Sequence, residues 1–307
     1  MTGSAGLREI WAAESASRDQ GMQPGRACLR NLCRLLARGL SLCALAGFGV
    51  LSACQHSAER VISTAPGVSY TVVVTDLAGP RGLLFSPSGD LYVVEQASGA
   101  IARIFPEGQV ARIAEGLSDP HDLARDARGN LYVAETGQNR VVRISPEGAV
   151  MTYIAGLSTP VDLDFNPQGE LLICELWRGR VLAYTSPDNM RVFFSDLRGP
   201  HGLAFAGAGV TYINDWGAGR IVKVSSDGRM ERVAEVQTPV GLALGRSGDL
   251  YVAERALGRV SRIKSDGTRT TVIEGLQGPR DPAFDAAGNL HVAEWDTGRI
   301  IRLHGGF

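Results

Sequence analysis

One short segment recurs six times between residues 80 and 294 of this 307-residue sequence, at an almost constant interval. Each copy begins at a proline and ends fifteen residues later at a carboxylate, as in PHDLARDARGNLYVAE (120–135). The prolines stand at steps of 40, 40, 40, 39 and 40 residues and are Pro80, Pro120, Pro160, Pro200, Pro239 and Pro279. The carboxylates are Glu95, Glu135, Glu175, Asp215, Glu254 and Glu294. Such a repeat predicts an array of similar modules rather than one layered domain.

Each repeat carries the pattern of four short β-strands joined by tight turns. Runs such as LYVAE (131–135) and RVVRI (140–144) are rich in β-branched and aromatic residues and are separated by a turn of hairpin length. A PEG or SDG tripeptide marks the turn before the fourth strand in four copies. Four short strands in about forty residues are typical of a propeller blade. We therefore predict an all-β fold, a six-bladed β-propeller around a central channel.

The two ends of the array predict how the ring closes. The last copy stops at GRIIRLHGGF (298–307) and lacks its fourth strand. YTVVVTDL (70–77) precedes the first copy and matches the fourth strands of the others. We therefore expect the N-terminal strand to complete the last blade, which removes two unpaired sheet edges. The propeller is predicted to span residues 68–307.

The first fifty residues differ in composition from the repeats. Arginines precede an apolar run, GLSLCALAGFGVL (39–51), which is short for a membrane span and leads into LSAC. This order predicts a secretory signal peptide over residues 1–53, with Met22 as an alternative start. LSAC resembles the lipobox of bacterial lipoproteins, which implies that Cys54 is acylated and begins a linker over residues 54–67. The expected location is the cell envelope, as a periplasmic or outer-membrane lipoprotein that meets the membrane through its lipid alone.

Composition narrows the classes of partner. A formal net charge of −1 gives no basis for nucleic-acid binding. Cys174 is the one cysteine after Cys54, so no disulfide framework is expected. We expect a monomer whose partner is a small molecule or a peptide.

The repeat resembles a known family of propellers. GNLYVAETGQNRVVRI (129–144) is similar to the NHL unit, and the resemblance to NHL-repeat and gluconolactonase-like six-bladed propellers covers residues 70–307. The strands that end in glutamate also resemble those of the streptogramin lyases. Propellers support many functions, so the function has to be inferred from the site.

The residue after each proline varies between copies, although its neighbours repeat. Because the inner strands of a propeller all start on one face, these residues should gather around one mouth of the channel. They are Arg81, His121, Val161, His201, Val240 and Arg280. In a closed ring Arg280, Arg81 and His121 would form an arc that suits a small anionic ligand. An aspartate follows in three copies and could instead neutralise the arc internally: Asp122, Asp162 and Asp281.

The two histidines suggest a metal. DPHDLA and GPHGLA resemble two of the three histidine motifs that hold zinc in peptidyl-amidating lyases, but the third position reads GPRDPA. The resemblance implies His121 and His201 as ligands, whereas Arg280 is permanently charged and cannot ligate. A third ligand would have to come from Asp162 or a glutamate. A divalent ion such as Ca, Mg or Zn is one expectation, and hydrogen-bonded polar residues at strand starts are the other.

The carboxylates that end the repeats are expected to have a structural role rather than a functional one. Five of the six are followed five residues later by an arginine, which a hairpin places opposite the carboxylate as an ion pair. Glu95 is the exception because Ala100 stands in the arginine's place. We therefore expect an unpaired carboxylate at the mouth, unless Arg103 or water satisfies it. Trp216 and Trp295 each follow a carboxylate, and either stack on a ligand or pack between blades.

Two functions of different classes follow. The sequence contains no Gly-x-Ser-x-Gly elbow, P-loop, His-Glu-x-x-His or Cys-x-x-Cys motif. The first hypothesis is an exported, lipid-anchored module that binds a small anionic ligand or a peptide at the channel mouth. The alternative is a metal-assisted lyase or hydrolase, lactonase-like or streptogramin-lyase-like, with His121, His201 and Glu95 as candidate catalytic residues. A scaffold that binds another envelope protein through its rim is a third interpretation.

Overall fold

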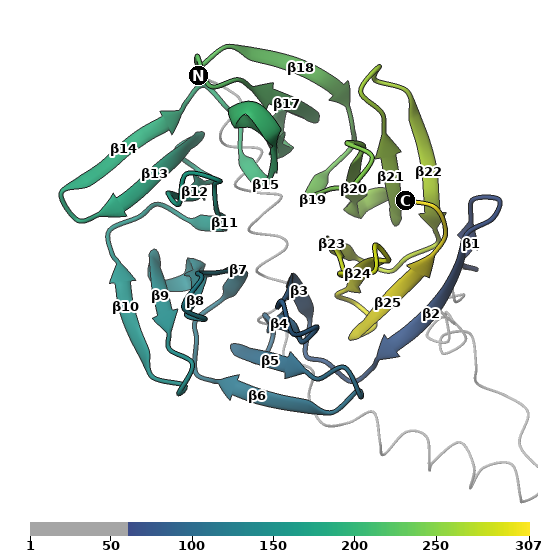
Figure 1. Ribbon diagram of the computed structural model, residues 1–307, viewed down its shortest axis with the longest axis horizontal. Helices are drawn as coiled ribbons and strands as arrows, with labels where there is room; N and C mark the ends of the chain where they lie inside the picture. The colour runs from purple at the N-terminus through teal and green to yellow at the C-terminus, as the bar shows by residue number, and fades with distance from the viewer. Residues whose placement is uncertain (1–60) are drawn as a thin grey trace, which may run out of the picture. The chain divides into compact units, whose positions relative to one another are not determined.

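Six antiparallel sheets are arranged radially around a central channel in the computed structural model, which describes residues 61–307 (Figure 1). The predicted all-β, six-bladed propeller is confirmed. The predicted signal peptide and Cys54 lie outside the described residues.

The four strands of each blade run from the channel to the circumference, and their ends coincide with the sequence pattern. The inner strands all begin at the repeated proline: β3 (Pro80–Phe85), β7 (Pro120–Arg125), β11 (Pro160–Phe165), β15 (Pro200–Ala206), β19 (Pro239–Leu244) and β23 (Pro279–Phe284). The second strands all end at the repeated carboxylate: β4 (Leu91–Glu95), β8 (Leu131–Glu135), β12 (Leu171–Glu175), β16 (Val210–Asp215), β20 (Leu250–Glu254) and β24 (Leu290–Glu294). The third strands are β5 (Ala100–Ile104), β9 (Arg140–Ile144), β13 (Arg180–Ser186), β17 (Arg220–Val224), β21 (Arg259–Ile263) and β25 (Arg299–His304). The outer strands are β6 (Val110–Ala114), β10 (Val150–Ile154), β14 (Asn189–Phe194), β18 (Met230–Glu235), β22 (Arg269–Glu274) and β2 (Ser69–Val74).

The ring is closed by β2, which is the outer strand of blade six. It pairs antiparallel with β25, so that Tyr70 lies opposite Leu303 and Val72 opposite Ile301. Figure 1 shows β2 running along the outside of β25. The prediction that the N-terminal strand completes the last blade is confirmed. A further short strand, β1 (Ser63–Thr64), pairs with β22 and gives blade five a fifth strand that the repeats do not predict.

The hydrophobic core lies between neighbouring blades, because alternate side chains of each strand face the two adjoining sheets. Tyr132 of blade two, for example, packs edge-on against Phe165 of blade three at a ring-centroid distance of 5.2 Å. Among residues 61–307 the helices are single 3₁₀ turns, and none is long or apolar enough to span a bilayer. They are η1 (Thr136–Gln138), η2 (Gly207–Gly209), η3 (Trp216–Ala218) and η4 (Arg255–Leu257).

The repeated carboxylate is buried in every blade and joins two segments in an arrangement that we call the corner clasp. It accepts a backbone N–H from the residue two positions before the proline, for example from Arg198 to Asp215 at 2.6 Å and from Gln237 to Glu254 at 3.0 Å. In five blades it also pairs with the arginine that begins the third strand, as Asp215 does with Arg220 at 2.8 Å. The ion pairs predicted within these blades are confirmed.

Blade one completes its clasp from a different strand. Glu95 accepts hydrogen bonds from Arg112 of β6, from Nε at 2.7 Å and from Nη2 at 2.9 Å. Arg103 instead pairs with Asp90 at 2.8 Å. The expectation of an unpaired Glu95 is therefore wrong: the outer strand supplies the guanidinium that Ala100 cannot.

Breaking one clasp should cost far more stability than breaking an ion pair on the surface. Arg220→Met leaves the buried Asp215 carboxylate without its cation, and we expect the free energy of unfolding to fall by roughly 3 kcal/mol. Arg191→Met is the control, because Arg191 and Glu170 form a solvent-accessible pair worth at most about 1 kcal/mol. Urea unfolding measures both, and equal losses would contradict the structural role of the clasp.

Candidate functional site

The inner strands turn two consecutive side chains toward the channel. In a regular strand neighbouring side chains point to opposite faces of the sheet. Here each inner strand loses register directly after its proline, for example between Pro160 and Asp162 and between Pro200 and Gly202. An irregularity of this kind bends the strand and re-aims its side chains. The residue after the proline and the one that follows can therefore line the same pocket.

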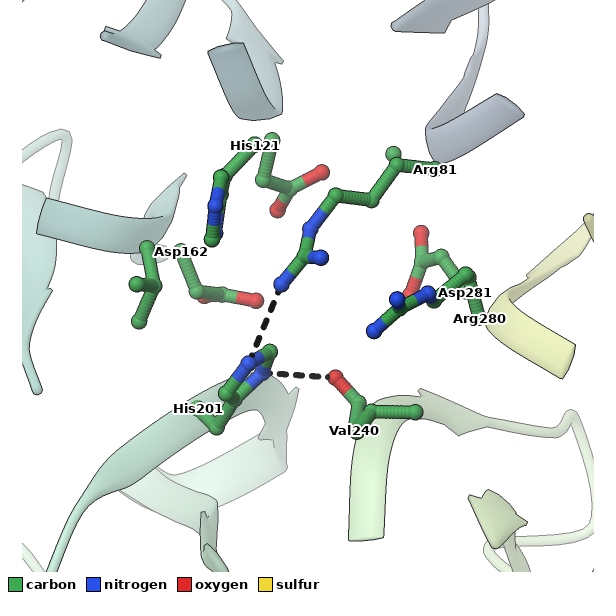
Figure 2. A pocket seen from close by; sticks show the side chains of 10 residues that line it. Arg81, His121, Asp162, His201, Val240, Arg280 and Asp281 are labelled. Carbon is green, nitrogen blue, oxygen red and sulfur yellow. Dashed lines mark hydrogen bonds between the residues drawn. The ribbon is translucent and has the colours of Figure 1, made fainter. Parts of the chain in front are cut away.

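A pocket at the channel mouth is lined by residues from all six inner strands (Figure 2). They are Arg81, Gly82, His121, Asp122, Val161, Asp162, His201, Val240, Arg280 and Asp281. The structure thus brings together five predicted site residues from five blades, including both histidines and both arginines. Those four side chains are buried although they surround the channel.

Arg81 spans the channel from blade one to blade four. Its Nη2 donates to Nε2 of His201 at 3.1 Å, and its Nη1 donates to Oε1 of Gln96 at 3.4 Å. Nδ1 of His201 donates to the carbonyl oxygen of Val240 at 2.9 Å (Figure 2). Because a carbonyl only accepts, this network assigns His201 as the neutral tautomer with its proton on Nδ1. Burial, and next the charge of Arg81, hold the pKa of His201 well below its usual 6.5.

Gln96 links three blades around Arg81. Its Oε1 also accepts from Nε1 of Trp295 at 3.1 Å, and its Nε2 donates to Oδ1 of Asp119 at 2.7 Å. Oδ2 of Asp119 lies 3.5 Å from Nε2 of His121. The sequence does not predict Gln96 or Asp119 as site residues. Gln96 follows the repeated carboxylate, at the position that Trp216 and Trp295 hold in their copies, and no other copy carries a glutamine there.

The two predicted tryptophans have different surroundings. Trp295 joins the mouth, with Cζ of Arg280 5.9 Å from its ring centre. Its indole crosses onto blade one beside Gly79, where a Cβ would lie 2.6 Å from Nε1, so a larger residue there would displace it. Trp216 begins η3 and packs beside Gly199. Among the described residues, the pocket lining includes none of Trp216, Trp295 and Glu95, and Trp295 borders it through Arg280.

The aspartates of the mouth are half-buried and hold their protons unusually tightly. Burial, together with the charge of Asp164, raises the pKa of Asp122 to about 7. Burial and the neighbouring aspartates raise the pKa values of Asp162 and Asp281 well above the usual range. A raised pKa favours the protonated carboxyl, so these aspartates offset the guanidinium charges of the mouth less than ordinary carboxylates would.

The mouth is a constriction above a wider space. Its free volume is about 10 Å³, close to that of one water molecule. The space beyond holds about 120 Å³ and is lined by the aspartates and by leucines of the inner strands. Only a compact group can therefore enter between the side chains of the mouth.

The histidines, as arranged, do not fit a metal ion. Their ring centroids lie 6.4 Å apart, but the lone pair of Nε2 of His201 already accepts a hydrogen bond from Arg81. A catalytic zinc ion normally needs three protein ligands. In the described part of the chain no group of three or more histidine, cysteine or acidic side chains is placed to hold a metal. We therefore derive no metal-dependent step.

Comparisons with solved structures find the same fold at low sequence identity. The chain is similar to a gluconolactonase from Xanthomonas campestris, with 18% identity, a TM-score of 0.71 and coverage of 79% of this chain and 91% of that chain. It is similar to virginiamycin B lyase from Staphylococcus aureus, with 16% identity, a TM-score of 0.60 and coverage of 79% and 99%. It is also similar to the PQQ-bound aldose sugar dehydrogenase from Streptomyces coelicolor, with 19% identity, a TM-score of 0.65 and coverage of 79% and 99%. No family model and no curated protein sequence matches the chain. The expected resemblance to gluconolactonase-like and streptogramin lyase propellers is confirmed as a likeness of fold.

The raised pKa of Asp122 predicts a pH-dependent cost in stability. The folded state keeps a proton that the unfolded state releases between the ordinary pKa of 3.8 and the raised value of about 7. The contribution of Asp122 to the free energy of unfolding therefore falls as the pH rises through this window. Asp122→Asn removes that loss, so the variant should gain stability relative to the wild type from about pH 5 to about pH 8. Urea unfolding at both pH values tests this, with Asp227→Asn in an exposed turn as the control. A difference between Asp122→Asn and wild type that does not change with pH would contradict the assignment.

Proposed function

We propose that this propeller binds a small anionic ligand, or the terminal carboxylate of a peptide, at its channel mouth through Arg81 and Arg280. The observation that supports this most directly is that two guanidinium groups from adjacent blades are buried, with 6% and 5% of their surface exposed, in the lining of one opening. A guanidinium fork matches a carboxylate or phosphate with two parallel N–H···O bonds.

The charge balance of the mouth favours an anion. A buried charge is costly unless an opposite charge or several hydrogen bonds meet it. Burial raises the pKa values of Asp162 and Asp281, which favours their protonated form and weakens them as counter-ions. An incoming carboxylate or phosphate would add a full negative charge beside the two guanidinium groups.

The dimensions of the mouth limit how the ligand can sit. With about 10 Å³ free between the side chains, only the charged end of a molecule can reach the guanidinium groups. The body of the ligand would then remain on the rim, where the half-buried indole of Trp295 offers an aromatic surface next to Arg280.

A second candidate function is a lyase or hydrolase activity at the same mouth. It is favoured by acid–base groups with shifted pKa values in one pocket: His201 is neutral, and Asp122 titrates at about 7. Two of the similar structures are a gluconolactonase and a lyase, and those activities belong to those proteins. Turnover of small lactones separates the candidates. Hydrolysis that is lost in His201→Ala and in Asp122→Asn but kept in Arg229→Ala would favour the enzyme.

We also propose that the propeller is exported and held at the cell envelope by an acylated Cys54. The support is the LSAC motif after an apolar run, and it comes from the sequence alone.

Removal of the lipidation cysteine should release the protein from the membrane. In Cys54→Ser the thiol that would carry the lipid is gone, so the protein should move from the membrane fraction to the soluble fraction. Cell fractionation measures this, with Cys174→Ser as the matched control. Membrane retention of Cys54→Ser would overturn the anchoring proposal.

Loss of either arginine should weaken anion binding. For Arg81→Ala and for Arg280→Ala we expect affinity to fall at least about tenfold, because each removes a charged hydrogen-bond donor. Isothermal titration with phosphate and with small carboxylates measures the effect. Arg229→Ala, in an exposed turn, is the control and should change little. Unchanged affinity in both site variants would contradict the proposed function.

A further inference from the structure

A second pocket lies between blades four and five, on the face of the propeller opposite the channel mouth. It holds about 320 Å³ and is lined by the ends of β17 and β21, the start of β20 and the turn after β21. Successive strands of a blade alternate in direction. The ends of the third strands therefore lie on the other face from the ends of the second strands, where the mouth is.

Both lysines of the 307-residue sequence line this pocket. Lys223 is half-buried near the end of β17, and Lys264 is exposed directly after β21. Elsewhere the chain uses arginine for its permanent positive charges. Lysine presents a compact ammonium on a flexible stem and can adapt to the shape of an anion.

The other blades supply an internal control for Lys223. At the equivalent position of blade one, Arg103 pairs with Asp90 of the preceding turn at 2.8 Å, and blade five contains the same type of pair. In blade four the position of the turn aspartate is held by Val210. Within residues 61–307 no ion pair joins Lys223 to a carboxylate. Blade four therefore keeps the cation of this pair and lacks its counter-ion.

The two carboxylates in the lining are engaged with other groups. Glu231 pairs with Arg229 at 3.2 Å, and Oδ1 of Asp266 accepts from the backbone N–H of Thr268 at 2.8 Å. The charge of Lys264 acts on Asp266, so Lys264 is partly balanced. Arg232, the third cation of the lining, pairs with Glu235 at 2.6 Å. Lys223 lies opposite Glu231 in the sheet and is the half-buried cation of the pocket.

Apolar side chains form a smaller part of the pocket, whose lining is otherwise polar. Leu250 and Ile263 are buried there, and the half-buried Tyr212 and Val233 extend the surface. Small-molecule sites typically combine apolar surface with polar groups that fix orientation. The cations lie at the rim, so a ligand with a charged end and an apolar body matches both parts.

We propose that this pocket is a second binding site, which takes a small organic anion. Its carboxylate, sulfonate or phosphate contacts Lys223 and Lys264, and its apolar part lies on Tyr212 and Val233. The site is independent of the channel mouth, because the two share no residue.

Fluorescence titration of the protein with 1-anilinonaphthalene-8-sulfonate tests the proposal, because this probe joins a sulfonate to an aromatic body. We expect Lys223→Met to weaken binding about tenfold and Lys264→Met to weaken it less. Lys223→Arg keeps the charge and should retain most of the affinity. Arg302→Met removes the same charge from the equivalent position of blade six and should leave binding within about twofold.

Equal affinities in Lys223→Met and Arg302→Met would overturn the proposal. A loss of probe binding in Arg81→Ala but not in Lys223→Met would also overturn it, while leaving the channel-mouth function intact. Thermal unfolding establishes that each variant is folded. If Lys223→Met does not fold, Lys223→Gln and the exposed Lys264→Met carry the same test.

Discussion

The buried carboxylate at the end of each second strand is the interaction on which the channel mouth depends. By accepting the N–H of the residue two positions before the proline, it fixes where the inner strand begins. The side chains after the proline can then converge on one opening. A buried carboxylate without a cation is strongly destabilising, so each blade needs a guanidinium at this corner. In blade one Ala100 stands where the other blades have the arginine, and Arg112 of β6 supplies the guanidinium instead.

On this regular frame the mouth itself is asymmetric. The six inner strands are nearly equivalent, yet the residues after the prolines include two arginines, two histidines and two valines. The hydrogen bond from Arg81 to His201 crosses the channel, and it commits the lone pair of His201 to a guanidinium. This hydrogen bond leaves Nε2 of His201 without a lone pair for a metal ion, and it also holds the Arg81 guanidinium across the opening. Because burial raises the pKa values of the aspartates, they offset the guanidinium charges less than ordinary carboxylates would, and an anion is the ligand that the mouth suits best.

The fold could be predicted from the sequence because its signals are local and repeated six times. The starts of the inner strands, the ends of the second strands and the closure by residues 69–74 all follow from prolines, carboxylates and turn residues. The site was predictable only in part. The residues after the prolines do gather at one mouth, but the contacts among them join different blades. Gln96 joins Trp295 to Asp119 across blades, and within blade one Arg112 of β6 reaches Glu95 past the intervening β5. No spacing along the chain encodes such contacts, and this is why the expectation for Glu95 failed.

A crystal structure of the propeller soaked in phosphate tests the central claim most directly. Convergence of the inner strands predicts density for an anion within hydrogen-bonding distance of the Arg81 and Arg280 guanidinium groups, on the face where Trp295 lies. An empty mouth with both guanidinium groups turned away from the channel, or an anion bound only elsewhere, would contradict it.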